Sequence, residues 1–257
     1  MAAGALAGSF VAGFGTDSTR SHPRLSLSNA RTVAVKPAAR PPLGPPPVAT
    51  GGRLPGVDCR RAKCVALTFD DGPDIYTERL LHTLRSAHVR ATFFMVGIQV
   101  QKFPAVARHV AGATEEIGDH TWDHQDLTQI SPHDARVEIA RARTEIADVI
   151  GMLPALFRPP YGSMNPAVAA MVGSAGMPVI QWNVDTLDWR DRITNVVAQR
   201  AVNQARPGSI ILMHDIYPST VDAVPAIIKG LRQRGFTLVT VSQLLGSPRP
   251  GQTYFNR

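Results

Sequence analysis

The stretch Val65-Ala66-Leu67-Thr68-Phe69-Asp70-Asp71-Gly72-Pro73 decides the fold of this chain. Its first five residues are apolar or β-branched and predict a buried strand, which ends in two adjacent carboxylates. Gly72 and Pro73 then predict a turn, so the strand should deliver both acids to the edge of a sheet. The alternative is that Asp-Asp-Gly-Pro is only a turn, since these residues are common in turns.

The positive charge of the chain lies mainly before this stretch. The 257 residues carry a formal net charge of +7, and residues 1–56 hold six basic residues against one acidic residue. The remainder has no basic run and no interleaving of basic and aromatic residues of the kind that single-stranded nucleic acids require. We therefore expect no nucleic-acid partner.

Residues 1–56 predict no folded domain. Residues 2–14 are small and apolar, too few to span a bilayer, and resemble a secretory signal without its positive start. We interpret residues 1–14 as a truncated signal segment, with an Ala/Gly tail as the alternative. Residues 15–56 are rich in Pro, Ser and Arg and predict a disordered linker. We expect a monomer that is secreted or associated with the cell wall, without stable membrane insertion.

The two cysteines, Cys59 and Cys64, stand just before the opening strand. A single CxxxxC without a second pair is poor support for a zinc finger. The two residues either form a small disulfide, which would imply an oxidising compartment, or are two free thiols. We favour the disulfide.

After Cys64 the chain alternates between apolar runs and amphipathic stretches. The order is a strand followed by a helix, repeated about seven times, which predicts an α/β fold with a parallel sheet, either closed as a barrel or open. No glycine-rich phosphate motif follows the first strand, which argues against a dinucleotide-binding fold. The predicted strands are residues 65–69, 91–96, 116–118, 156–157, 179–184, 209–213 and 236–241. The predicted helices are residues 76–87, 100–111, 131–151, 166–174, 193–205 and 220–234.

Chemically capable side chains follow five of the predicted strands. Reactive groups of a βα barrel gather on the loops after the C-terminal strand ends, so these segments should meet at one rim. Five such segments are hard to explain as chance. They are Asp70-Asp71, His120-Thr121-Trp122-Asp123-His124, Arg158-Pro159-Pro160-Tyr161-Gly162, Asp185-Thr186-Leu187-Asp188-Trp189 and His214-Asp215.

The HxxxH spacing of His120 and His124 is a common way for one short segment to bind a divalent metal. A carboxylate from Asp70 or Asp71 would complete a His-His-Asp set with open positions, as catalytic metal sites have. Successive strand side chains diverge, so one aspartate can bind metal while the other acts as a general base. His214 ends its strand with Leu212 on the same face, which places a protonatable group beside an apolar contact.

These five segments together resemble the ordered motifs of the NodB-like polysaccharide deacetylases, carbohydrate esterase family four. The resemblance covers about residues 64–246 and implies a distorted (β/α) barrel of about seven strands, with a single catalytic domain at residues 57–248 and a tail at 249–257. It implies metal-dependent removal of acetyl groups from a polysaccharide. It also implies roles for ten residues: Asp70 as general base; Asp71, His120 and His124 as metal ligands; His214 as general acid; Arg158 orienting Asp70; Asp185 steadying Arg158 or His214; Leu212 in the pocket for the acetyl methyl group; the backbone N–H of Tyr161 at the oxyanion; and Trp189 as a wall of the groove.

Two residues before the metal pair depart from the family pattern Gly-His-Glu-Ile-Gly-Asn-His. Glu115 replaces a histidine and Asp119 an asparagine, and a carboxylate beside a metal ligand could tighten or disturb metal binding. The leading hypothesis is an N-deacetylase of a GlcNAc-containing polymer, peptidoglycan or chitin, with Zn²⁺ as the expected metal and Co²⁺ or another divalent ion as alternatives. The competing hypotheses are an O-deacetylase of acetylated xylan and a carbohydrate-binding protein with a degenerate site.

Overall fold

The computed structural model describes Val48–Ala49 and residues 57–257, which all belong to one structural unit. The expected signal segment, residues 1–14, lies outside the described residues, and so does the expected linker except for two residues. Those two form strand β1 (Val48–Ala49), which pairs in parallel with β5 (Leu153–Pro154). The prediction of a linker without secondary structure was therefore wrong at these two positions.

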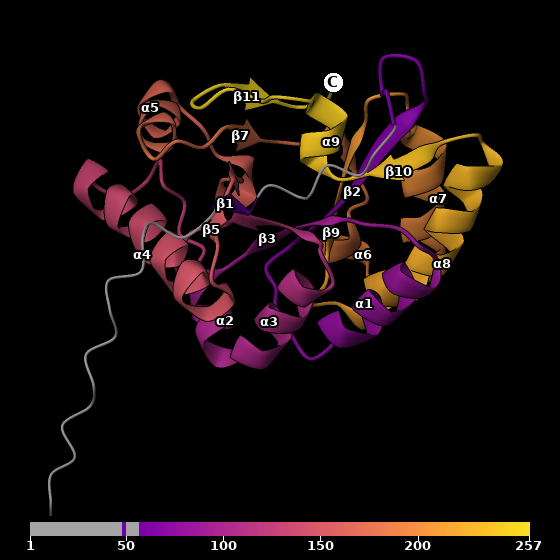
Figure 1. Cartoon of the computed structure of the whole chain (residues 1–257), viewed down its shortest axis with the longest axis horizontal. Helices are drawn as coiled ribbons and strands as arrows, with labels where there is room; N and C mark the ends of the chain where they lie inside the picture. Colours follow the sequence, from indigo (N-terminus) through magenta and orange to yellow (C-terminus); the bar gives the residue numbers. More distant parts are fainter. Residues whose placement is uncertain (1–47, 50–56) are drawn as a thin grey trace, which may run out of the picture. The chain divides into compact units, whose positions relative to one another are not determined.

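A nine-stranded sheet forms the centre of the fold (Figure 1). The order is β11-β7-β6-β4-β3-β2-β9-β8, with β10 pairing with β2 off this path, and every ladder between these strands is parallel. The sheet curls into a distorted half-barrel with β11 and β8 at its two ends, so the expected α/β barrel is present in an open form. The strands are β2 (Cys64–Asp70), β3 (Thr92–Met95), β4 (Glu116–Asp119), β6 (Leu156–Phe157), β7 (Val179–Ile180), β8 (Val184–Asp185), β9 (Ile210–His214), β10 (Thr237–Val239) and β11 (Thr253–Tyr254).

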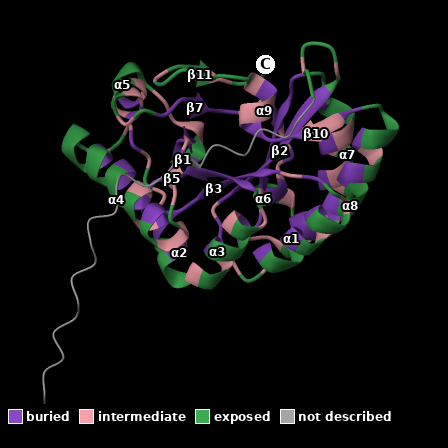
Figure 2. Cartoon of the chain, in the orientation of Figure 1, coloured by how far each residue is buried: buried purple, intermediate pink, exposed green. Residues whose placement is uncertain are grey.

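Helices connect the parallel strands and cover the sheet, and the longer ones, such as α1, α4 and α8, bury one face and expose the other (Figure 2). They are α1 (Thr77–Ser86), α2 (Gly97–Lys102), α3 (Pro104–Gly112), α4 (Pro132–Ile150), the 3-10 helix η1 (Pro160–Gly162), α5 (Pro166–Ser174), α6 (Asp188–Asp191), α7 (Thr194–Gln204), α8 (Pro218–Gln233) and α9 (Val241–Leu245). None of the described helices has the length and apolar character needed to cross a bilayer.

Strand β2 is buried along its whole length, as expected for a central parallel strand that is covered on both faces. Val65, Leu67 and Phe69 belong to the large apolar cluster that contains residues of α1 and α8. Ala66 belongs to a second cluster on the other side of the strand. Because strand side chains alternate, Thr68 and Asp70 share the facing of Ala66 and point toward the interior of the half-barrel.

The helix over 131–151 is confirmed, and its ends have the expected caps. The Ser131 side chain accepts a hydrogen bond from the backbone N–H of Asp134 at the start of α4. Pro132 occupies the first turn, where its missing N–H costs nothing. Gly151 ends the helix at φ +77°, a conformation that glycine adopts without steric strain.

Several boundaries differ from the prediction for identifiable reasons. The predicted helix over 100–111 is two helices, α2 and α3, because Pro104 cannot continue a helix and instead begins the second. The predicted strand over 179–184 is split into β7 and β8. The expected tail, residues 249–257, contributes β11 to the sheet beside β7.

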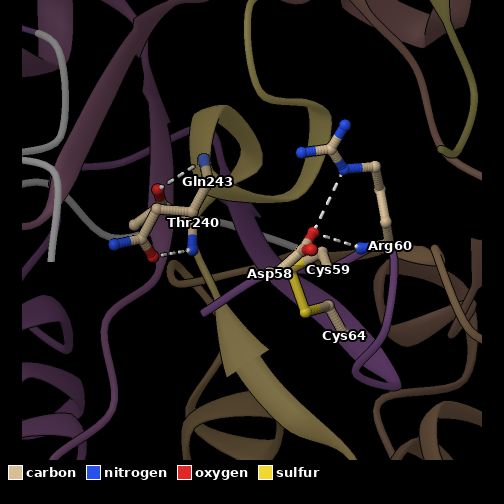
Figure 3. Close-up of a disulfide and its surroundings, with 6 residues drawn as sticks. All are labelled: Asp58, Cys59, Arg60, Cys64, Thr240 and Gln243. Atoms are coloured by element: carbon tan, nitrogen blue, oxygen red, sulfur yellow. Dashed lines mark hydrogen bonds and ion pairs between the residues drawn. A yellow bond between two sulfur atoms is a disulfide. The ribbon is translucent and has the colours of Figure 1, made fainter. Parts of the chain in front are cut away.

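A disulfide between Cys59 and Cys64 closes the loop that enters β2, as Figure 3 shows. Asp58 lies at the start of this loop and accepts hydrogen bonds from the backbone N–H and the side chain of Arg60. The bond is at the amino end of β2, whereas Asp70 stands at its carboxyl end. Its role is therefore to fix the entry into the central strand.

We expect the double variant Cys59→Ser with Cys64→Ser to lower the free energy of unfolding by about 2 kcal/mol, the loop entropy of so short a cross-link. Chemical denaturation of the variant and the native protein measures the difference. The deacetylation that the family resemblance implies should stay unchanged under native conditions, and a loss of activity in the fully folded variant would contradict this purely structural role.

Candidate active site

The register of the sheet brings the predicted strand ends together. Asp70 of β2 is the direct neighbour of His214 of β9. On the other side of β2, β3 pairs with β4, which ends at Asp119, one residue before His120. Asp119 in turn pairs with Phe157, the residue before Arg158. These four strand ends therefore meet at one rim of the half-barrel.

Three of the residues at this rim could hold a metal ion. One ligand atom each from Asp71, His120 and His124 lies within 4.8 Å of the other two. Asp71 Oδ1 is 3.4 Å from His120 Nε2 and 3.3 Å from His124 Nε2. The rings of the two histidines are 4.9 Å apart and meet edge to face, so both Nε2 atoms can face one point.

The hydrogen bonding of His120 and Asp71 suits a metal. His120 Nδ1 lies 2.7 Å from the backbone oxygen of Arg158, which fixes Nδ1–H as the donor and leaves the Nε2 lone pair for a ligand bond. Asp71 Oδ1 is buried and has no hydrogen-bond partner among the described residues. A buried carboxylate oxygen without a partner is costly, and a cation between it and the imidazoles would satisfy it.

The local charges also favour a bound cation. Burial alone would raise the pKa of Asp71, but the neighbouring imidazoles lower it to about 2. Burial and the charge of His120 lower the pKa of His124, which keeps that imidazole neutral as a metal ligand requires. Burial opposes protonation of His120, but Asp70 and Asp71 raise its pKa. Two carboxylates therefore draw positive charge, a proton or a metal ion, to the point between the imidazoles.

Two of the three candidate metal ligands, and one residue of the loop between the histidines, lie at strained backbone positions. Asp71, Thr121 and His124 all have positive φ, at 72°, 68° and 68°, and residues other than glycine seldom adopt this backbone conformation. Asp119 Oδ1 accepts from the backbone N–H of Thr121, and the Thr121 hydroxyl accepts from that of His124. Glu138 of α4 adds a second support, since its Oε2 accepts from the backbone N–H groups of Trp122 and Asp123.

Asp70 is tied to a buried arginine. Its Oδ1 lies 2.7 Å from Arg158 Nη1, which also donates to the hydroxyl of Thr68, two residues earlier in β2. Arg158 is fully buried, its Nε–H donates to the backbone oxygen of Ile180, and its Nη2 donates to that of Gln181. Asp70 Oδ2 is left facing the metal-binding residues, 3.8 Å from His120 Nε2. The expected contact between Arg158 and Asp70 is therefore present.

His214 is held by an aspartate other than the expected one. Its Nδ1 is 2.9 Å from Oδ1 of Asp188, whose Oδ2 accepts from the backbone N–H of His214 and from the Thr220 hydroxyl. Asp185 instead accepts from the backbone N–H of Leu187, so the prediction that Asp185 steadies Arg158 or His214 was wrong. Asp185 lies at the end of β8, whereas Asp188 begins the short helix α6 that follows and reaches the His214 imidazole from there.

The pairing with Asp188 determines the protonation of His214. Burial alone disfavours the imidazolium, but the hydrogen bond to Asp188 and the charges of Asp188, Asp71 and Asp70 raise the pKa of His214 to about 9. With Nδ1 engaged, Nε2 is the nitrogen that faces the rim, 4.0 Å from Asp71 Oδ2. His214 can therefore offer a proton into the site at neutral pH.

The three residues expected to contact substrate occupy different positions. Tyr161, at φ +59°, is 69% exposed and its ring meets that of His124 edge to face at 4.6 Å. Leu212 is buried in β9, two residues before His214. Trp189 is exposed on α6. All three lie on segments that form the rim, and their roles toward a substrate remain proposals.

The two departures from the family pattern do not add a ligand to the metal-binding residues. Glu115 lies at the amino end of β4, away from the rim, and accepts from the backbone N–H of Ala91. Asp119 is wholly buried, and burial raises its pKa to about 8. A neutral carboxyl group offers a donor as well as an acceptor, as the asparagine amide does with its NH₂ group and carbonyl oxygen, so Asp119 can accept from the backbone N–H of Thr121 as an asparagine would.

Two supporting residues were missed by sequence reasoning. Asp188 stands in the same predicted segment as Asp185, and only the unpredicted turn of α6 distinguishes them. Glu138 lies in the middle of a long amphipathic helix, where a glutamate is usually a solvent-exposed residue. No local sequence signal identifies its contact with the HxxxH loop.

The protein is a parallel α/β half-barrel whose rim has a possible Asp-His-His metal site, with the carboxylate of Asp70 and the imidazole of His214 next to it. A sequence profile described as polysaccharide deacetylase matches residues 58–180. A solved structure described as "T48 deacetylase with substrate" is 41% identical, with a TM-score of 0.75, and the match covers 77% of this chain and all of that one.

Curated relatives agree. The peptidoglycan-N-acetylglucosamine deacetylase PgdA of Listeria monocytogenes is 36% identical over 76% of this chain and 42% of that protein. The peptidoglycan-N-acetylmuramic acid deacetylase PdaC of Bacillus subtilis is 40% identical over 71% of this chain and 38% of that protein. A peptidoglycan-N-acetylglucosamine deacetylase of Bacillus cereus is 35% identical over 71% of this chain and 88% of that protein. The chain belongs to the polysaccharide deacetylase family, and it spans about two fifths of the length of PgdA and PdaC.

Proposed function

We propose that this protein is a metal-dependent hydrolase that removes N-acetyl groups from a GlcNAc-containing polysaccharide. The observation that carries the proposal is the position of Asp70 and His214 on neighbouring strands, with Asp70 Oδ2 and His214 Nε2 both facing the possible metal site. A base and an acid are thus placed on either side of a point where a carbonyl could be polarised.

Asp70 is the proposed general base. Arg158 holds Oδ1, so Oδ2 is the atom that takes a proton from the attacking water. Because Arg158 is itself fixed by four hydrogen bonds and is buried, the carboxylate cannot rotate away from the site. This fixed orientation is what a general base requires, since the proton must be within hydrogen-bond reach.

His214 is the proposed general acid. Asp188 fixes Nδ1 and favours the imidazolium, so Nε2–H can protonate the departing amine nitrogen. An amine is a poor leaving group without that proton, so the acid matters most for an amide substrate.

Asp71, His120 and His124 are the proposed metal ligands, and Zn²⁺ is the proposed ion because two imidazoles and one carboxylate suit it. A divalent cation, when bound, supplies the Lewis acidity that polarises the acetyl carbonyl and the attacking water. The backbone N–H of Tyr161 is proposed to stabilise the oxyanion, and Leu212 and Trp189 to contact the acetyl methyl group and the sugar.

Peptidoglycan or chitin is the proposed substrate, and the secreted or cell-wall location follows from it. The named relatives act on the N-acetylglucosamine or N-acetylmuramic acid of peptidoglycan. The disulfide supports an oxidising compartment. The competing activity is ester hydrolysis on acetylated xylan, because the same residues can cleave an acetate ester.

Product analysis on a panel of substrates tests the proposal. Purified, metal-loaded protein is incubated side by side with acetylated chitooligosaccharides, peptidoglycan and acetylated xylan, and released acetate and deacetylated sugars are identified. We expect acetate from an N-acetylated polymer. Release from xylan alone would replace the proposal with the esterase, and release from none would support a carbohydrate-binding protein.

The dependence of amide hydrolysis on pH should have a basic limb set by His214. The acid is protonated below its pKa and lost as the pH rises through it, so kcat/KM should fall at or somewhat below pH 9, because a metal ion beside Asp71 offsets part of that carboxylate's charge. Asp188→Asn removes the partner carboxylate and should move the limb to lower pH. A limb that stays in place in this variant would contradict the assignment of the acid.

A further inference from the structure

Arg192 lies near His214, the proposed acid, with the ring of Tyr217 between the two side chains. The Tyr217 ring lies 5.7 Å from the His214 ring, centroid to centroid, and the Arg192 guanidinium lies 4.3 Å from the centroid of the Tyr217 ring. Arg192 follows α6 directly, and Tyr217 directly precedes α8, so both side chains are carried by the ends of helices that belong to the rim.

The backbone fixes where Arg192 points. Arg192 has φ +51°, and Leu187 at the other end of α6 has φ +54°, so the short helix is bounded by two left-handed residues. Its backbone N–H donates to the oxygen of Asp188, the residue that holds His214. Arg192 is thus positioned by the same turn that positions the partner of the proposed acid.

Arg192 differs from the neighbouring arginines in having no carboxylate partner among the described residues. Arg190 and Arg200 both pair with the carboxylate of Asp191. Arg192 is exposed, and no carboxylate among the described residues forms an ion pair with it. The Arg192 guanidinium lies over the Tyr217 ring and also hydrogen-bonds with the Tyr217 side chain. A guanidinium has five N–H donors, so those that Tyr217 does not engage are available to a carboxylate of a ligand.

The surface around Arg192 suits a sugar polymer. Trp189 is 46% exposed and Ile193 55% exposed, on either side of the turn in sequence. Exposed aromatic and apolar side chains on the same short segment as a cation without a carboxylate partner fit a polymer that has both sugar faces and acidic groups. Chitin is neutral, whereas peptidoglycan has carboxylates on its lactyl groups or on its peptides.

We propose that Arg192 binds a carboxylate of the polymer beside the sugar that is deacetylated, and that the protein therefore prefers acidic glycan strands to neutral ones. The proposal rests on the proposed function, because that function places the reacting sugar against His214. Arg192 would act on binding and specificity and would not take part in the chemical step.

The test uses four substrates of matched length. Peptidoglycan strands stripped of peptides present lactyl carboxylates, and intact strands present peptide carboxylates, which distinguishes the two sources. Stripped strands whose carboxylates have been converted to methylamides, and chitotetraose, are the neutral controls. The variants are Arg192→Gln, Arg192→Lys, and Arg190→Gln, which removes the same charge two residues away.

We expect Arg192→Gln to lower kcat/KM about tenfold on the acidic substrate that Arg192 recognises, through a higher KM, and to leave both neutral substrates unchanged. Arg192→Lys keeps the charge without the fork and should lose less. Added salt should weaken the preference of the native protein for the acidic strands. Arg190→Gln should behave as the native protein does on every substrate.

Equal losses on acidic and neutral substrates would overturn the proposal, and so would a loss of the same size in Arg190→Gln. If the native protein releases acetate from no substrate, the proposed function fails instead. Equilibrium binding then decides separately: calorimetry with stripped strands and their methylamides should give a preference for the acidic form that Arg192→Gln removes. No preference in the native protein would refute the site.

Discussion

Asp70→Asn should lower the turnover of the native protein by about 10²–10⁴-fold, the usual contribution of a general base, while the metal still binds. Asparagine keeps an oxygen that can accept from Arg158 Nη1 but cannot take a proton from water. The three proposed ligand atoms belong to Asp71, His120 and His124, so none is altered. Acetate release and bound metal per chain, measured on the same sample, give the result.

The matched control is Asp71→Asn, the same change one residue later. It should lose metal affinity, and turnover with it, because it removes the charge that the two imidazoles face. Both variants need a check of folding, since Arg158 is buried and loss of its charged partner can cost about 3–5 kcal/mol of stability. If Asp70→Asn lost the metal and Asp71→Asn kept it, the two aspartates would have the opposite roles.

His214→Ala should lower amide hydrolysis by about 10²–10⁴-fold and ester hydrolysis by less. The amine of an amide needs a proton in order to leave, whereas the alcohol of an ester depends on that proton less. Rates on an N-acetylated chitooligosaccharide and on an acetate ester of a sugar, compared with those of the native protein, give the two losses.

Asp188→Asn is the informative partner of this variant, because it retains the imidazole and removes the carboxylate at Nδ1. It should keep more activity than His214→Ala at low pH and lose it as the pH rises. Equal losses of amide and ester hydrolysis in His214→Ala would contradict the role of a general acid and would leave His214 as a structural residue of the rim.

The central strand β2 was predictable because its apolar sequence matches its buried position in the sheet. Val65 to Phe69 read as a buried strand, and a parallel strand covered on both faces needs a continuous apolar run. The divergence of Asp70 and Asp71 follows from the alternation of side chains at a strand end. The structure adds that Asp71 has φ +72°, so the backbone leaves the strand geometry between the two acids.

The partner of His214 could not be predicted from the sequence. Asp185 and Asp188 differ by three residues, and which of them faces the imidazole depends on the four-residue helix α6 and on Leu187 at φ +54°. So short a helix has no period to detect, and a left-handed leucine has no sequence signature. The contacts of Glu138 with Trp122 and Asp123 likewise depend on how α4 packs, which no local pattern encodes.

Strand ends and chain ends were the least predictable parts of the fold. The segment 236–241 was predicted as one strand, whereas β10 ends at Val239 and Thr240 caps helix α9 through a capping box with Gln243 (Figure 3). β11 and β1 are two-residue strands, too short to show alternation, and exist only because a neighbouring strand pairs with them.

Metal dependence of acetate release is the most direct test of the account. The native protein is freed of metal with a chelator, dialysed, and assayed on an N-acetylated glycan before and after addition of Zn²⁺ or Co²⁺. We expect no acetate from the metal-free protein and recovery with about one ion bound per chain, as one Asp-His-His set predicts. Acetate release that survives complete removal of the metal, or its absence from every glycan in the panel after metal is restored, would contradict the account.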